Sequence, residues 1–232
     1  MIYIKQIVFL FLFILCFFLH PFNCEAEEIN VELVWQFPNP SWLEVEIRQG
    51  VYDLFFNNDV KLSLKKDERF IIGQSSLVSF LTKDGKLWII DKPNIIMKTF
   101  DDGVFRVREP QKGWLSYRGN LTFVKIKGCW KLINSLDQEE YLKGVVPIEM
   151  GNAWAEQGFE ALKAQAVAAR TYLIKNMGPN KTITDSPNIH QAYLGKTVEG
   201  EASKAVEATN GEILVDIYTK EPISVFYSSH NG

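Results

Sequence analysis

Cysteine is scarce in this chain of 232 residues. Of its three cysteines, Cys16 and Cys24 lie within the first 26 residues, which leaves Cys129 in the rest of the sequence. If the first 26 residues are removed as a leader, no internal disulfide can form and no cysteine-based zinc site can be assembled. No metal site and no cofactor are expected in this chain.

Positive charge is also in short supply. The chain has 25 lysine and arginine residues against 28 aspartate and glutamate residues, which gives a net charge of −3 and an isoelectric point near 5.7. Proteins that bind nucleic acid through its phosphates usually carry a basic surface. A general nucleic-acid partner is therefore not expected.

The apolar run at the N-terminus is too short to span a bilayer comfortably. It follows Lys5 and covers residues 7–19, thirteen residues, whereas a spanning helix needs about twenty. The pattern is typical of a signal peptide at residues 1–26, cleaved after Ala26, and predicts export to the cell wall, the periplasm or the medium. The alternatives are an uncleaved membrane anchor and lipid attachment at Cys24, although the residues before Cys24 lack the small and aliphatic side chains that attachment prefers.

Strand-forming residues, by contrast, are abundant. From residue 29 to about residue 136, some ten short segments rich in β-branched and aromatic residues are separated by Gly, Asn, Asp and Pro. Clear turn signals stand at residues 57–59, 83–85 and 101–103. We expect a β-rich region at residues 27–115, folded as a barrel or a sandwich, without assigning the order of its strands.

Aromatic residues make up 13% of the chain. That density suits a β-rich body and a carbohydrate-facing surface equally well. Trp42, Trp88 and Trp114 can either stack on sugar rings or close the core, and closing the core is the simpler interpretation.

After Asn134 the apolar period changes from two to three or four, so the fold class predicted for the whole chain is α+β. A short helix is expected at about residues 138–145, with Asp137 as its N-cap and Glu140 as the reciprocal partner in a capping box. We expect Pro147 to end this helix and Glu149 to lie on the exit turn.

One long helix is expected at about residues 159–177, stopped by Gly178 and Pro179. On a helical wheel, Lys163 and Arg170 lie roughly 20° apart. Either both point into one groove or both are solvated helix charges. The other two faces are a core face and a face of little bulk that another backbone could approach: Leu162, Ala166, Ala169 and Leu173 for the first, and Ala161, Ala164, Gln165, Ala168 and Tyr172 for the second.

The stretch YLKGVVPIEM, followed by EALKAQAVAARTY, resembles the central block of the stage II sporulation protein D family (SpoIID), which includes the domain named for the amidase enhancer LytB. The resemblance extends upstream to YRGNL and downstream to TDSPNIHQAYLG, AVEATNGEILV and ISVFYSSHNG. Together these blocks cover about residues 116–232, whereas residues 27–115 match only loosely. The family's last block continues past the point where this chain stops, so the domain at 116–232 is expected to be incomplete at its C-terminus.

The resemblance implies a lytic transglycosylase acting on peptidoglycan glycan strands, with Glu149 as its catalytic acid and base. One carboxyl group suffices if the sugar's own 6-hydroxyl attacks C1, whereas ordinary glycosidases need two carboxylates. For Glu149 to act as an acid near neutral pH, burial must raise its pKa, and Val146, Met150 and Trp154 are candidates for that burial.

The resemblance also implies a set of substrate-binding residues. We expect the two cations of the long helix to contact substrate rather than Glu149, and Tyr193 has core packing as an equal alternative. The two histidines near these blocks lack a neighbouring cysteine, so they are weak support for zinc. The substrate-binding set is Lys163, Gln165, Arg170, Gln191, Tyr193, Ser228 and Ser229.

Three functions therefore compete. The first is an exported glycan-cleaving enzyme, whose partners are glycan strands. The second is a non-catalytic wall-binding module that recruits or stimulates an amidase or another wall hydrolase. The third is a structural exported domain. The carboxyl group of Glu149 favours the first, because a site that only binds has little use for an acid.

Overall fold

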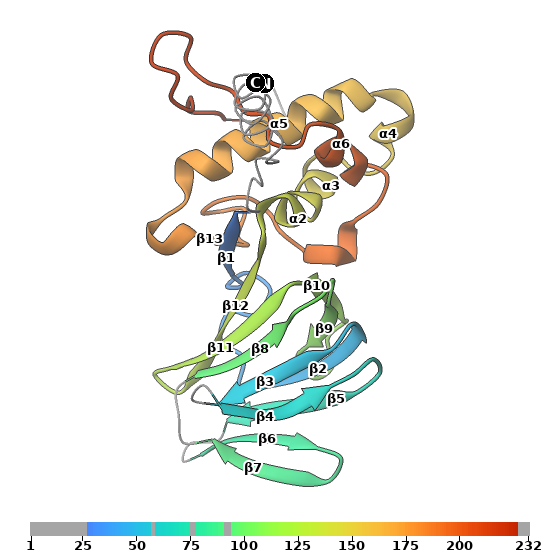
Figure 1. The fold of residues 1–232 in the computed structure, drawn as a ribbon, viewed down its shortest axis with the longest axis vertical. Helices are drawn as coiled ribbons and strands as arrows, with labels where there is room; N and C mark the ends of the chain where they lie inside the picture. The colour runs from blue at the N-terminus through green and yellow to red at the C-terminus, as the bar shows by residue number, and fades with distance from the viewer. Residues whose placement is uncertain (1–26, 57–58, 75–77, 91–93, 227–232) are drawn as a thin grey trace, which may run out of the picture.

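The computed structural model describes residues 27–56, 59–74, 78–90 and 94–226. The predicted signal peptide lies outside the described residues. Within them, no helix is long and apolar enough to cross a membrane. The protein has a β-rich body and a helical layer, and β12 runs from the first into α2 of the second (Figure 1).

The body consists of two sheets. One has seven strands in the order β13-β1-β12-β11-β8-β3-β4, and the other has six in the order β10-β9-β2-β5-β6-β7. All pairs are antiparallel except β1 with β13. The strands are β1 (Glu28–Glu32), β2 (Trp42–Gln49), β3 (Tyr52–Phe56), β4 (Asp59–Leu64), β5 (Arg69–Gln74), β6 (Ser79–Lys83), β7 (Lys86–Ile90), β8 (Asn94–Thr99), β9 (Val104–Arg108), β10 (Leu115–Arg118), β11 (Asn120–Ile126), β12 (Cys129–Asp137) and β13 (Thr182–Thr184).

Aromatic side chains from the two sheets meet in one core. The ring of Tyr52 on β3 contacts that of Phe105 on β9 at 5.9 Å between centroids, and Phe70 on β5 lies 6.2 Å from Phe123 on β11. The sheets therefore pack face to face as a sandwich, one of the two predicted forms. Strands from both sides of residue 115 enter each sheet, so the sandwich core does not end at the predicted domain boundary.

The three tryptophans of the predicted β-rich region have different surroundings. Trp88 is partly buried and packs against the core. Trp114 lies under two guanidinium groups, those of Arg106 and Arg108, at 4.4 and 4.3 Å from the ring centroid. Trp42 is 46% exposed. Of these three side chains, Trp42 has the most open ring.

The helical layer contains both predicted helices, each within two residues of its expected bounds. Asp137 is the N-cap of α2 as expected, since its carboxylate accepts hydrogen bonds from the backbone N–H groups of Glu139 (2.8 Å) and Glu140 (3.3 Å). Among the described residues, however, the predicted capping box is not reciprocal, because the Glu140 side chain has other partners. The Glu140 side chain pairs with Arg118 and Lys143. The helices are α2 (Gln138–Lys143), α3 (Val146–Glu149), α4 (Trp154–Gln157), α5 (Phe159–Asn176) and α6 (Ser203–Ala208), with 3-10 turns η1 (Pro179–Lys181) and η2 (Gly195–Val198).

The prediction that Pro147 ends the first helix is wrong. α2 ends at Gly144, and Pro147 lies in the first turn of α3, where its missing N–H group leaves no helical hydrogen bond unmade. Glu149 is consequently the last residue of a short helix rather than part of a loop. The chain then turns at Gly151, whose φ of +79° favours glycine.

The predicted core face of α5 is confirmed, since all four of its residues are fully buried. Of the small-residue face, Ala161 and Ala164 are exposed, so in the described part of the chain no backbone approaches them closely. α5 lies across the top of the layer, with α2 and α3 beneath it and α6 beside it (Figure 1).

Candidate functional site

Glu149 lies at the C-terminal end of α3 with an exposed side chain. Desolvation by the surrounding atoms nevertheless raises the pKa of its carboxyl group, and a hydrogen bond from the backbone of Ala192 partly opposes that shift. Neither Lys163 nor Arg170 contributes to this pKa. The carboxyl group is thus reachable from solvent, anchored on one backbone amide, and biased toward its neutral form.

Gln191 and Tyr193, on either side of Ala192, are both buried. The Gln191 amide accepts a hydrogen bond from the Tyr141 hydroxyl (3.3 Å) and donates one to the Ala169 carbonyl (3.2 Å). The Tyr193 hydroxyl donates to Asn134 at 2.8 Å. Both side chains point into the interior, so Gln191 does not line an open groove as expected, and Tyr193 adopts the core packing that was its equal alternative. It is the backbone between them that reaches Glu149.

The turn after Glu149 is tied to a distant segment. The Asn152 side chain accepts a hydrogen bond from the backbone of Ala202 (2.9 Å) and donates one to the Val198 carbonyl (3.2 Å). A Cβ at Gly200 would lie 2.6 Å from the Asn152 side chain, so a larger residue there would displace that side chain. We did not predict this role for Asn152; its position directly after the glycine that breaks the chain was the available signal.

Arg170 is a structural residue, contrary to the expectation that it contacts substrate. Its side chain has no exposed surface, and its guanidinium pairs with both carboxylate oxygens of Glu139 at 2.6 Å each. It also donates to the carbonyls of Val206 and Glu212. A glycan cannot reach it in this arrangement.

Lys163 shares the helix face of Arg170 but has a different environment. It is partly exposed and pairs with Glu160, one turn earlier on α5, at 2.9 Å. The two cations differ because α6 and the following chain cover the C-terminal half of this face and bury Arg170, whereas the side chain of Lys163 keeps 32% of its surface exposed. The helical wheel predicts the side of the helix on which a residue lies, but it does not show which other segments pack against that side.

Comparison with known proteins identifies this region. Residues 127–215 match the family model described as SpoIID, stage II sporulation protein. This part of the chain is a SpoIID domain. An amidase enhancer of Bacillus subtilis is 46% identical over 91 residues, which are 39% of this chain and 12% of the relative. Stage II sporulation protein D of the same organism is 32% identical over 120 residues, 43% of this chain and 34% of the relative.

A third relative reaches beyond the SpoIID domain. An uncharacterized protein of Brachyspira hyodysenteriae is 33% identical over 171 residues, which are 68% of this chain and 45% of that protein. The chain therefore spans less than half the length of each of these three relatives.

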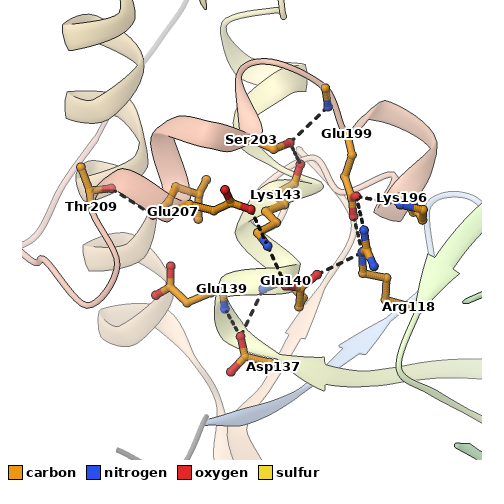
Figure 2. Close-up of polar contacts among 12 residues, drawn as sticks. Arg118, Asp137, Glu139, Glu140, Lys143, Lys196, Glu199, Ser203, Glu207 and Thr209 are labelled. Carbon is orange, nitrogen blue, oxygen red and sulfur yellow. Dashed lines mark hydrogen bonds and ion pairs between the residues drawn. The ribbon is translucent and has the colours of Figure 1, made fainter. Parts of the chain in front are cut away.

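The SpoIID domain is joined to the sandwich by a network of ion pairs that sequence reasoning missed. Figure 2 shows Arg118, on β10, between Glu140 of α2 and Glu199, with contacts of 3.0 Å to the first and 2.7 Å to the second. Lys143 in turn lies between Glu140 (2.7 Å) and Glu207 of α6 (3.0 Å). The available signal was Arg118 within the YRG block.

Asp185, from the TDSPNIHQAYLG block of the SpoIID domain, is fully buried. Its carboxylate accepts hydrogen bonds from the backbone N–H groups of Trp35 (2.7 Å) and Gln36 (3.1 Å), which fixes the connection between β1 and β2. Desolvation raises the pKa of Asp185 to about 6, although these hydrogen bonds oppose the shift.

Three predicted substrate-binding residues remain, Gln165, Ser228 and Ser229. Gln165 is partly buried, and its Nε2 has no hydrogen-bond partner among the described residues. Ser228 and Ser229 lie outside the described residues, as does His230. His190 faces Thr184, 2.9 Å from its hydroxyl. Within the ranges that the structure describes, no three Asp, Glu, His or Cys side chains are grouped as metal ligands would be.

Proposed function

We propose that this chain is an exported lytic transglycosylase that cleaves peptidoglycan glycan strands, with Glu149 as its catalytic acid and base. The observation that carries the proposal is the state of Glu149: an accessible carboxyl group, neutral over a wider pH range than usual because desolvation raises its pKa, and held by one backbone amide. Its place in a SpoIID domain, whose relatives include an amidase enhancer, supports a role at the cell wall.

The geometry suits a reaction in two halves. The protonated Glu149 donates its proton to the glycosidic oxygen as the bond from C1 to that oxygen breaks. The resulting carboxylate removes the proton of the sugar's 6-hydroxyl, whose oxygen forms the new bond to C1. Glu149 is neutral again at the end, the product carries a 1,6-anhydro ring, and no water is consumed.

Trp154 offers a surface for a sugar ring near this group. It begins α4, five residues after Glu149, and is 48% exposed. Its ring lies against Gly158, where a Cβ would be 2.7 Å from the indole. An aromatic ring held in this way can stack on the apolar face of a sugar. Lys163 and Gln165 remain proposed substrate contacts, since both are partly exposed on the neighbouring helix.

A second candidate is a non-catalytic wall-binding module that assists an amidase. The observation in its favour is the 46% identity with a protein named amidase enhancer. On this alternative Glu149 contributes to binding alone, and the protein sediments with wall material without releasing products.

Replacement of Glu149 by glutamine tests the proposal, because it keeps the shape and removes the acid. We expect anhydro-ended products from denuded or intact glycan strands, measured by mass spectrometry, to fall by roughly 100-fold or more. Glu156→Gln is the matched control, since Glu156 is an exposed carboxylate on α4, and it should retain activity. Undiminished product from Glu149→Gln would refute the assignment, and binding without product by the unmodified protein would favour the amidase-assisting alternative.

A further inference from the structure

The amide that contacts Glu149 belongs to a backbone segment with little freedom to move. Ala192 is 5% exposed, and its neighbours Gln191 and Tyr193 are 2% and 0% exposed. The hydrogen bond to Glu149 depends on the position of its donor, the backbone N–H of Ala192. The contacts that fix this segment therefore also fix the donor.

Gln191 connects the segment to two helices at once. Its side-chain amide accepts from the Tyr141 hydroxyl of α2 and donates to the Ala169 carbonyl of α5, both in the buried core. Because an amide has its acceptor and its donor on opposite sides of one carbon, making both contacts determines the position of the side chain. The position of the side chain in turn determines the position of the peptide group that joins Gln191 to Ala192.

The other end of the segment is held both by hydrogen bonds and by packing, and the backbone N–H of Tyr193 donates to the Asp185 carbonyl at 3.3 Å. The Tyr193 ring lies 4.8 Å from the Tyr141 ring, and the backbone N–H of Leu194 donates to the Gly144 carbonyl at 3.3 Å. A Cβ at Gly144 would lie 2.7 Å from the Tyr193 ring. These contacts hold the peptide group that follows Ala192, whereas the side-chain hydrogen bonds of Gln191 hold the peptide group that precedes it and carries the Ala192 N–H.

We propose that Gln191 is a positioning residue for the reaction, because its side-chain amide holds the backbone N–H of Ala192 against the Glu149 carboxyl group and so fixes which carboxyl oxygen carries the proton. This inference rests on the proposed function.

The chemical consequence follows from the two oxygens of a neutral carboxyl group. One accepts hydrogen bonds and the other bears the proton. A fixed N–H donor pairs with the accepting oxygen, so the proton resides on the other oxygen. After the first half of the reaction, the same free oxygen is the one that takes the proton back from the 6-hydroxyl. Without the donor, the acidic proton is divided between two orientations, one of which does not face the glycosidic oxygen.

The test variant is Gln191→Leu, which keeps the size and removes both hydrogen bonds. The matched control is Thr209→Val, since Thr209 is equally buried, in the same domain, and its hydroxyl is bonded to the Ala205 carbonyl of α6. Both variants should lose stability. In Gln191→Leu alone we expect Glu149 to titrate at higher pH in carboxyl-detected NMR, the alkaline limb of the rate profile to move in the same direction, and turnover to fall about tenfold with little change in KM.

A second measurement needs no variant of Gln191. In the unmodified protein, the NMR signal of the Ala192 N–H should shift with pH at the point where Glu149 titrates, and this shift should vanish in Glu149→Gln. Unchanged titration of Glu149 in folded Gln191→Leu, or an Ala192 signal insensitive to Glu149, would overturn the inference. Neither readout needs glycan cleavage. If the proposed function fails, the titrations of Glu149 and of the Ala192 N–H signal should still behave as described, but no anhydro-ended product should form.

Discussion

The sandwich and the helical layer differ in how exposed their ion-paired arginine side chains are. On the sandwich, the side chains of β2, β5 and β9 form ion pairs along one sheet face. Arg69 is 60% exposed and lies 3.3 Å from Glu44 and 3.5 Å from the buried Glu46, which also pairs with Arg48 and Arg106. In the helical layer, Arg170 is fully buried against Glu139. Exposed pairs gain little because water screens them, whereas a buried charge must keep its partner. An exposed arginine such as Arg69 can therefore be replaced at little cost, because Glu46 keeps its pairs with other arginines, whereas the buried Arg170 holds Glu139 within the helical layer.

Removing the two arginines separately should give the largest contrast between the regions. Arg170→Ala leaves Glu139 with a poorly solvated, unpaired charge and should lower the free energy of unfolding by roughly 3–5 kcal/mol. Arg69→Ala should lower it by about 1 kcal/mol or less. Denaturant titration of both variants measures the difference. Equal losses would mean that the burial of the ion pair does not distinguish the two regions.

Asp185 extends the comparison to pH, because its buried carboxylate directly follows β13 and fixes the connection between β1 and β2. Its pKa in the folded protein, about 6, is above the ordinary aspartate value of 3.8, so the folded state binds the proton more tightly than the unfolded state. The contribution of Asp185 to stability is therefore fully present below about pH 4 and is lost as pH rises through 6, by roughly 3 kcal/mol.

Asp185→Asn isolates this contribution, since asparagine has the same shape and does not titrate. Unfolding free energies of the two proteins, measured from pH 4 to pH 7, should diverge, with the unmodified protein losing stability relative to the variant. Subtracting the two curves removes the effects of other carboxylates such as Glu46 and Glu68, whose pKa values are lowered. A difference that does not vary with pH would contradict the raised pKa.

The helices and strands were more predictable from the sequence than the surroundings of Glu149. Alternation and turn residues predicted the strands, and the core face of α5 followed from its wheel, because both depend on local periodicity. The site depends on contacts between distant segments. The roles of Arg170 and Gln191 depend on what α6 and α2 place beside them, and a motif that names these residues does not distinguish a groove from an interior. Glu149 was identified from its motif, but its contact with the Ala192 amide required the fold.

The smallest expected effect concerns sugar binding. Two tryptophans of similar exposure, one in each region, allow the two regions to be compared. Trp154 belongs to the helical layer near Glu149, and Trp42, 46% exposed, begins β2 of the sandwich. In the Glu149→Gln background, where glycan is not consumed, Trp154→Ala should weaken binding of denuded glycan strands about tenfold, or about 1.4 kcal/mol, by calorimetry. Trp42→Ala should leave it unchanged. If Trp42 is the residue that matters, the glycan binds the sandwich, and the division between a supporting body and a binding layer fails.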